Sequence, residues 1–358
     1  MFLRLNVRDV SLACAFAASV VSGSTFASTI NQNTSWTITR SGSSSTYRVV
    51  AYGDSIFAGY YGNLFNVARR ASPYTSGEYL AHKWNTNVEV VRRTKSGAKA
   101  DDIYNNKIIS ERSYMQDAKT RVVMFEMCGN DYLQARSAFS EQTGTCNYGV
   151  LDTALANCTT YMEKGMQAIN QYATSAKAKI IMNIYYPGYG ADNVQTGCTD
   201  ASTGGKVNRQ QKFLPYMAKS NWRACNLAEK YGFKCADAFA EMMGSDYDSN
   251  GDGLNDVDGL RYKSGESEAA YVNRITTTLR STIRDANTHY VNSSTSFDYI
   301  QSDNTHPTYF KSTIGTGSGS GASDFADSAI SGGKQAEWNK WGHEKSGWSI
   351  STYNPATP

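Results

Sequence analysis

Short apolar runs alternate along the chain with longer segments in which apolar residues recur at helical spacing. The first run, Tyr47–Tyr52, is mostly apolar and stops at Gly53, which favours a strand covered on both faces. Similar runs follow at Val88–Arg92, Val122–Glu126, Ile180–Tyr185 and Phe233–Ala236. Between them lie segments of helical spacing, among them Tyr79–Trp84, Tyr161–Tyr172 and Leu214–Tyr231.

This alternation of strand and helix predicts an α/β fold with a mostly parallel sheet and helices on both faces, a three-layer α/β/α sandwich. In such sheets ligands bind beyond the carboxyl ends of the strands, so we expect the chemistry in the loops that follow them. The loops after the first three runs carry polar residues, at Gly53–Ser55, Thr94–Gly97 and Cys128–Asp131.

The composition is that of one large globular domain, with 358 residues, 40% of them hydrophobic and 19% charged. A formal net charge of +3 is too small to predict a nucleic-acid partner, and we expect none. No segment is both as long and as apolar as the ~20 residues that cross a bilayer, so no transmembrane segment is expected.

The first residues have the pattern of a secretory signal peptide. Arg4 and Arg8 precede an apolar stretch, Val10–Val21, and Ala27 ends a run of small residues that suits a cleavage site. We therefore expect residues 1–27 to be removed and the mature protein to be secreted or periplasmic. The remaining divisions are a leader at 28–46, a main domain at 47–310, and a C-terminal elaboration at 311–358 that packs on the same domain.

Six cysteines follow the predicted signal peptide. An even number in a chain bound for an oxidising compartment predicts three disulfides. The sequence does not fix the pairing, although Cys146 and Cys158 are close enough along the chain to close a local loop. The six are Cys128, Cys146, Cys158, Cys198, Cys225 and Cys235.

Four short segments, in this order, resemble those of the SGNH (GDSL-type) hydrolase family. They are Gly53-Asp54-Ser55, Gly97, Asn130 and Asp303-x-x-His306, and each falls at a predicted strand end or in a loop. The resemblance spans roughly Tyr47 to Pro307, and Cys128 departs from it by standing where the family has a glycine. It implies a flavodoxin-like sheet and an ester hydrolase with a serine nucleophile.

The chemistry of these residues points to the same reaction. A serine hydroxyl is a poor nucleophile until a base takes its proton, and His306 suits that role because imidazole titrates near neutrality. Asp303 precedes it closely enough for one tight turn to orient the ring. We expect Ser55 to attack an ester carbonyl, His306 to move the proton and Asp303 to hold His306.

The resemblance also implies an oxyanion hole made by the backbone N–H groups of Ser55 and Gly97 and the side-chain amide of Asn130. Such donors stabilise the negative oxygen of a tetrahedral intermediate, and loss of one donor lowers the rate by about 10²–10³-fold. Gly97 suits the role because a residue without a side chain lets its backbone approach a ligand closely. Asp54 is expected to brace the turn, since its side chain should point away from that of Ser55.

An acidic segment around residue 250 has the pattern of a cation-binding loop. Acidic and amide side chains alternate with spacers, glycines permit a tight wrap, and oxygen ligands suit Ca²⁺. The segment resembles the calcium loops of thrombospondin type 3 repeats and dockerins. We expect a structural Ca²⁺ away from Ser55 and no cofactor for catalysis, against the alternative of a solvated acidic turn. The expected ligands are Asp246, Asp248, Asn250, Asp252 and Asp256.

These features predict a secreted serine esterase acting on O-acetyl or other short-acyl esters of a carbohydrate. The absence of a long apolar surface segment that would form an interfacial lid favours the short acyl group. A lipase, lysophospholipase or acyltransferase acting on longer acyl chains is the alternative with the same chemistry. A noncatalytic, calcium-stabilised carbohydrate-binding protein is the alternative from another class.

Overall fold

The computed structural model describes residues 30–61, 63–67, 72–245, 247–285, 290–291, 296–297 and 304–306. The expected signal peptide and C-terminal elaboration lie outside these ranges, as do Asp246 and Asp303. Within the described part of the chain, no helix has the length and apolar composition needed to cross a membrane.

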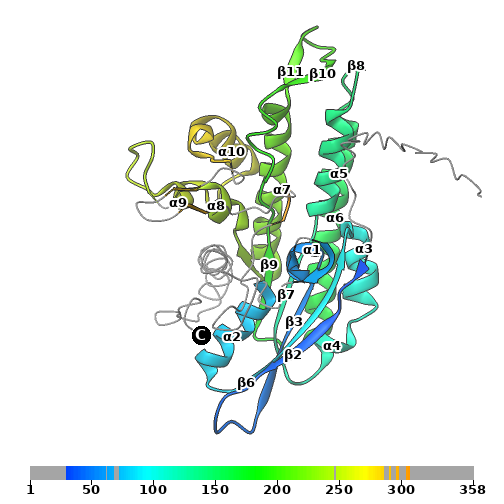
Figure 1. The fold of residues 1–358 in the computed structure, drawn as a ribbon, viewed down its shortest axis with the longest axis vertical. Coiled ribbons are helices and arrows are strands. Elements are labelled where there is room, and N and C mark those ends of the chain that lie inside the picture. The colour runs from blue at the N-terminus through cyan, green and yellow to red at the C-terminus, as the bar shows by residue number, and fades with distance from the viewer. Residues whose placement is uncertain are drawn as a thin grey trace, which may run out of the picture.

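Five strands form the parallel centre of the molecule. They are neighbours in the order β6, β3, β7, β9 and β12. This is the flavodoxin-like order 2-1-3-4-5, so the predicted fold class is confirmed. Figure 1 shows the strands below the projecting helices. Their bounds are Thr46–Gly53 for β3, Asn87–Ser96 for β6, Thr120–Glu126 for β7, Ala178–Met182 for β9 and Lys234–Ala236 for β12.

Two further strands cover the edge of this sheet. β1 (Ile30–Asn31) and β2 (Thr34–Ile38) both pair antiparallel with β6, which gives a sheet of seven strands among the described residues. β6 reaches both because it is ten residues long. Arg92 of β6 lies over the ring of Trp36, 4.5 Å from its centroid, which fastens the edge strand through a cation–π contact. Residues 30–31 and 34–38 of the expected leader are thus part of the sheet.

The register of the sheet shows that its two faces are covered by different helices. Val90 of β6 and Val122 of β7 lie beside the same residue of β3 and so point to one face, whereas Phe125, three residues later, points to the other. α2 (Ser72–Trp84) packs on the first face, with Gly77 against Val90. α6 (Gly149–Tyr172) packs on the second, with Gly165 against Phe125. The molecule therefore has three layers.

The two longest helices owe their position to apolar residues that recur on one side. α6 (Gly149–Tyr172) and α7 (Arg209–Tyr231) pack against each other. Asn208 caps the start of α7, because its side chain accepts from the N–H of Gln211 at 3.1 Å, and Gly232 caps the end. On α6 the buried residues recur every three or four positions, as a core-facing helix requires: Leu151, Leu155, Cys158, Met162, Met166 and Ile169.

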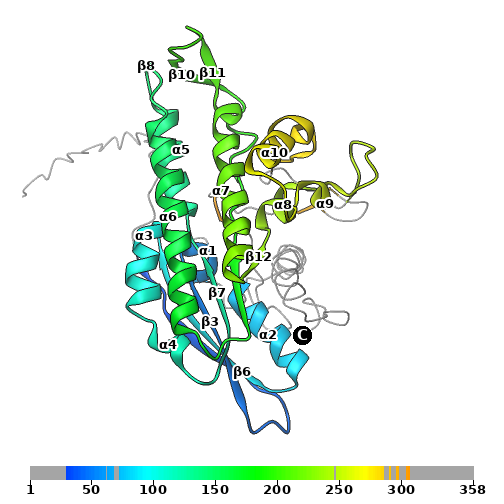
Figure 2. The same cartoon turned by 180° about the vertical axis from the view of Figure 1, so that it is seen from behind.

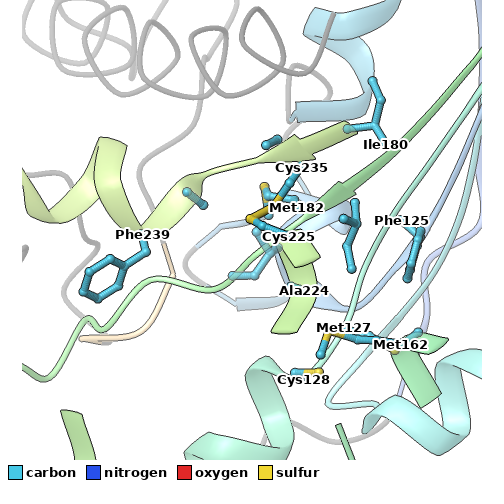
Figure 3. Close-up of a cluster of buried hydrophobic side chains, with 14 of the residues drawn as sticks. Phe125, Met127, Cys128, Met162, Ile180, Met182, Ala224, Cys225, Cys235 and Phe239 are labelled. Atoms are coloured by element: carbon cyan, nitrogen blue, oxygen red, sulfur yellow. A yellow bond between two sulfur atoms is a disulfide. The ribbon is translucent and has the colours of Figure 1, made fainter. Parts of the chain in front are cut away.

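The core fills both sides of the sheet. Figure 3 labels Phe125 of β7, Met162 of α6 and Ala224 of α7, together with Ile180 and Met182 of β9, which the register with Val122 turns to the face that α2 covers. Each of these five side chains is at most 4% exposed. Burial of this kind contributes about 25 cal/mol for each Å² of apolar surface removed from water. It fixes α6 and α7 on the sheet.

At their N-terminal ends α6 and α7 extend past the sheet. Helices of 24 and 23 residues are about 35 Å long, whereas the eight residues of β3 span about 26 Å. The overhanging ends carry a small three-stranded sheet, visible at the top of Figure 1. Its strands are β8 (Gly144–Thr145), β10 (Gln195–Thr199) and β11 (Lys206–Asn208).

The remaining elements are short, and the view from behind in Figure 2 shows α10 beside the upper part of α7. The helices are α1 (Ser55–Ala58), α2 (Ser72–Trp84), α3 (Ala100–Ile103), α4 (Ser113–Gln116), α5 (Gly129–Ser140), α8 (Ala238–Met243), α9 (Asp256–Leu260) and α10 (Glu268–Asn273). Single turns of other helix types cover Tyr104–Ile109, Arg274–Thr278 and Arg280–Thr282. Two hairpins are formed by β4 (Tyr60–Tyr61) with β5 (Asn63–Val67) and by β13 (Tyr290–Val291) with β14 (Ser296–Phe297).

The described residues contain three disulfides, as predicted, but not the local loop between Cys146 and Cys158. Cys158 lies nine residues into α6, about 14 Å along the axis from its start, and faces the beginning of α5. Cys146 precedes the helix and is hydrogen-bonded into the small sheet, where its N–H donates to the Thr199 carbonyl at 2.9 Å. The pairs are Cys128–Cys158, Cys146–Cys198 and Cys225–Cys235.

Candidate active site

Ser55 stands where the central strand turns into a helix. β3 ends at Gly53, and Ser55 is the first residue of α1. Asp54 caps this helix, because its Oδ1 accepts from the N–H of Ile56 at 2.8 Å. The capped turn leaves Ser55 at the carboxyl end of the sheet with 5% of its surface exposed. This is the edge at which α/β sheets bind ligands.

His306 meets Ser55 from the far end of the described chain. Its Nε2 lies 2.7 Å from Oγ of Ser55, within hydrogen-bond distance, although 251 residues separate the two. The imidazole is 6% exposed and packs against the ring of Tyr60, with the ring centroids 4.3 Å apart. The hydroxyl of Tyr185 donates to the Thr305 carbonyl at 2.7 Å and so anchors the segment that carries His306.

The third member of the predicted triad, Asp303, lies outside the described residues. Its role as the partner of His306 therefore stays a prediction. The segment resumes at Asn304, whose φ of 57° is left-handed, a conformation that asparagine adopts more readily than most residues.

The two other predicted oxyanion residues follow β6 and β7, the strands on either side of β3. Gly97 follows the last residue of β6 and has a φ of 76°, which glycine adopts without steric cost. Asn130 is the second residue of α5, and its Nδ2 donates to Oδ2 of Asp54 at 2.9 Å and to the Ala98 carbonyl at 3.0 Å. Asn130 thus connects the turn that carries Ser55 with the loop that follows Gly97.

Cys128, which stands where the pattern that the sequence resembles has a glycine, has a backbone conformation that favours glycine. Its φ of 88° is left-handed, so a glycine would be more easily accommodated there. A non-glycine residue in this region costs about 1–2 kcal/mol. The disulfide to Cys158 of α6 holds the residue in place. The loop before Asn130 is therefore fixed covalently to the layer of helices.

Glu126 is a residue of the site that sequence reasoning missed. It is the last residue of β7 and is 1% exposed, and its Oε1 accepts from the N–H of Asp54 at 2.5 Å. Burial raises the pKa of Glu126 well above its usual value, and the charge of Asp54 raises it further. A carboxyl group at the end of the apolar run Val122–Glu126 was the signal available in the sequence.

Asp131 was also missed as a functional candidate, and it joins three segments around the site. Its Oδ2 accepts from the N–H of Ala100 at 2.9 Å, and its Oδ1 accepts from Nδ2 of Asn157 at 2.5 Å. Burial raises the pKa of Asp131 to about 6. The side chain fixes α5 to the loop after β6 and to α6, which together place Asn130.

The acidic segment forms a turn around the carboxylate of Asp248. Oδ1 of Asp248 accepts from the N–H of Gly251 at 2.7 Å, and Oδ2 accepts from that of Gly253 at 2.9 Å. These bonds lower the pKa of Asp248. Asn250 and Asp252 bond to each other beside it, with Nδ2 of Asn250 donating to Oδ2 of Asp252 at 3.2 Å.

Asp256 is the buried member of this segment, at 3% exposed. Its Oδ1 accepts from the N–H of Ser249 at 3.1 Å, whereas its Oδ2 is buried without a hydrogen-bond partner. Asp246 lies outside the described residues. Among those that are described, no group of three or more His, Cys, Asp or Glu side chains is arranged to hold a metal ion.

No protein-family model matches the chain, and no curated protein is recognisably related to it in sequence. Solved structures similar to it include a lipase from a goat rumen metagenome, at 17% identity and a TM-score of 0.41, covering 66% of this chain and 99% of that one. An extracellular lipase from Streptomyces rimosus has 16% identity, a TM-score of 0.39 and the same coverage. A catalytic mutant of an acetylxylan esterase from Geobacillus stearothermophilus has 13% identity and a TM-score of 0.35, covering 57% and 79%. Function is therefore inferred from Ser55, His306 and the residues around them.

Proposed function

We propose that this protein is a carboxylic ester hydrolase that works through an acyl-enzyme on Ser55. The observation that carries the proposal is the distance of 2.7 Å between Oγ of Ser55 and Nε2 of His306 at the carboxyl end of the central strand. A serine hydroxyl held against an imidazole loses its proton to that base as it attacks a carbonyl carbon. An acyl-transfer site requires this contact, and a purely binding protein does not.

The reaction follows from these positions. Oγ of Ser55 attacks the ester carbonyl while its proton moves to Nε2 of His306, and the tetrahedral intermediate then expels the alcohol, which takes that proton. Water repeats the sequence on the acyl-serine and releases the carboxylic acid. We assign the oxyanion hole to the backbone N–H groups of Ser55 and Gly97 and the amide of Asn130, and the orientation of His306 to Asp303.

For Asn130 this role requires a shift in its hydrogen bonds. Its Nδ2 already donates to Asp54 and to the Ala98 carbonyl. An oxyanion carries a full negative charge and attracts a donor more strongly than a neutral carbonyl does. The developing oxyanion therefore takes over the donor that Ala98 accepts in the resting site, while the bond to Asp54 keeps the amide in position.

The substrate we propose is a short-acyl ester, such as an O-acetyl group, on a carbohydrate outside the cytoplasm. The aromatic ring of Tyr60 beside His306 supports a site that receives a sugar ring. The three disulfides suit an oxidising compartment, as expected for a secreted or periplasmic protein.

The test compares hydrolysis of p-nitrophenyl acetate with that of a long-chain p-nitrophenyl ester and of an acetylated xylo-oligosaccharide. We expect kcat/KM to be highest for the acetyl esters, and a fluorophosphonate probe to label the peptide containing Ser55. A preference for the long chain would assign the protein to lipases. No turnover and no labelling, in folded protein that binds the oligosaccharide, would assign it to binding proteins.

We also propose that the acidic segment binds a structural Ca²⁺. The feature that supports this is Oδ2 of Asp256, a buried carboxylate oxygen without a partner, which a cation would satisfy. Asp246, Asp248, Asn250 and Asp252 would supply the other oxygens, a donor set that suits Ca²⁺. The ion would brace the loop before α9 and take no part in the reaction.

A further inference from the structure

Two buried carboxyl groups lie under the turn that carries Ser55. Asp54 and Glu126 are each 1% exposed, and Oε1 of Glu126 accepts from the backbone N–H of Asp54 at 2.5 Å. Since two buried carboxylates so close together repel one another, a proton on one of the two is favoured, and burial together with the charge of Asp54 raises the pKa of Glu126. Burial raises the pKa of Asp54, and His306 is among the neighbours that act in the opposite direction.

The hydrogen bonds distinguish the two acids. Asp54 receives a donor on each carboxylate oxygen, the N–H of Ile56 on Oδ1 and the Asn130 amide on Oδ2. Several donors to one carboxylate favour its ionised form. Burial raises the pKa of both acids, but the donors to Asp54 oppose the rise there, whereas the charge of Asp54 adds to it at Glu126, so Glu126 is the acid that favours the proton.

Glu126 also contacts the backbone just before the nucleophile. Its Oε1 accepts the N–H of Asp54, the residue before Ser55, at 2.5 Å. The fit is close, because a side chain at Gly53 would collide with Oε1 of Glu126. The carboxyl group therefore fixes the backbone of the turn that carries Ser55.

Building on the proposed esterase function, we propose that Glu126 is a positioning residue that works in its protonated form. In that form its acid O–H donates to the carboxylate of Asp54, while its Oε1 accepts the backbone N–H of Asp54. The pair then carries one negative charge, which holds the Asn130 amide through Asp54. Loss of the proton would place a second buried charge beside the first, push the two side chains apart and release Asn130 together with the Ser55 turn.

This arrangement predicts an unusual order among substitutions. Glutamine at position 126 has the same length, accepts through Oε1 and donates through Nε2, so Glu126→Gln reproduces the protonated acid. Glu126→Asp keeps the ionisable group but shortens the side chain, so the contact with the turn is lost. Displacements of about 1 Å in a catalytic site cost up to about 10²-fold in rate.

The first experiment measures kcat and KM for p-nitrophenyl acetate in wild type, Glu126→Gln, Glu126→Asp and the control Glu241→Gln. Glu241 is a buried acid that is ion-paired with Arg261, on α8 rather than under the Ser55 turn. We expect kcat of Glu126→Gln to stay within a few-fold of wild type, and that of Glu126→Asp to fall tenfold or more with KM nearly unchanged. A higher kcat in Glu126→Asp than in Glu126→Gln would overturn the proposal.

The second experiment detects the proton directly and does not depend on turnover. At pH 7 the infrared spectrum should contain the carbonyl band of a protonated carboxylic acid, which shifts when the protein is labelled with ¹³C-glutamate. Glu126→Gln should abolish the band and Glu241→Gln should leave it. Absence of a glutamate-derived acid band in wild type would refute the protonated state, even if Glu126→Gln failed to fold. If no ester were hydrolysed but the band were present, only the proposed function would have failed.

Discussion

Asn130 donates from Nδ2 to Oδ2 of Asp54 at 2.9 Å, across 76 residues of chain. Because this bond aims the amide at the Ser55 turn, Asn130→Ala should lower kcat by about 10²–10³ and change KM little. Steady-state hydrolysis of p-nitrophenyl acetate measures both constants. Asn170→Ala is the control, since that amide bonds to Tyr231 at the end of α7 and should leave kcat unchanged. An unaltered kcat in Asn130→Ala would remove Asn130 from the oxyanion hole.

Ser55→Ala and His306→Ala should each abolish ester turnover, by up to about 10⁶-fold, because nucleophile and base act as one unit. Circular dichroism should show that both variants fold. Ser220→Ala removes another buried serine hydroxyl, the one beside Cys158, and should keep turnover near that of wild type. Near-normal turnover in Ser55→Ala would falsify the mechanism. Asp303→Ala should reduce kcat less completely, because that residue orients the base and does not react.

Asp131 should make stability depend on pH. Its pKa is about 6 in the fold and 3.8 as the ordinary value, so between these values the unfolded chain ionises the carboxyl while the fold keeps it protonated. The free energy of unfolding should therefore fall by up to about 3 kcal/mol as pH rises from 4 to 6. Asp131→Asn should flatten that part of the profile in urea unfolding at pH 4, 5, 6 and 7. Equal slopes in variant and wild type would contradict this.

The disulfides should separate stability from activity. Replacing Cys128 and Cys158 by Ala should cost roughly 2–4 kcal/mol of unfolding free energy and also lower kcat, because that bond fixes the loop before Asn130. Replacing Cys146 and Cys198 should cost a similar free energy and leave kcat unchanged, since that pair lies in the small sheet. Urea unfolding and steady-state kinetics give the two quantities. Equal losses of kcat in both double variants would show that the Cys128–Cys158 bond has no special role in placing Asn130.

Calcium should raise the melting temperature if it binds the folded acidic segment alone, with a gain of about 2.7 kcal/mol at a hundredfold excess over its Kd. Chelation should reverse the gain and, well below melting, leave esterase turnover unchanged. Asp256→Asn should abolish the calcium response, whereas Asp258→Asn, which alters an exposed acid paired with Arg261, should retain it. Melting that ignores both calcium and chelator would mean a solvated turn, and loss of activity without unfolding would mean that the ion lies elsewhere.

The main strands could be predicted from the sequence because each is a compact apolar run in a sheet covered on both faces. The run Val122–Glu126 corresponds to β7 with only two residues added at its start. Where the prediction erred, side-chain composition was misleading. The apolar run Ile180–Tyr185 predicted a longer strand, but β9 ends at Met182. Tyr185 lies beyond the strand and contacts the segment that carries His306.

Features that depend on tertiary contacts could not be predicted in this way. Cys158 pairs with Cys128 because α6 places it beside the start of α5. Closeness along the sequence does not reveal this closeness in space. Glu126 looked like the end of an apolar strand, and its contact with Asp54 arises only when β3 and β7 become neighbours. Motif order located Ser55 and Asn130, but not the hydrogen bonds that hold them.

The separation of 251 residues between Ser55 and His306 also bears on how the protein reaches its working state. Loop-closure entropy makes contacts between distant residues slow to form, whereas α6 and the turn after β3 involve nearby residues. The Ser55–His306 contact should therefore form late in refolding. Helical signal would return first and hydrolysis afterwards, so recovery of activity would measure completion of the fold more strictly than any spectroscopic signal from its helices.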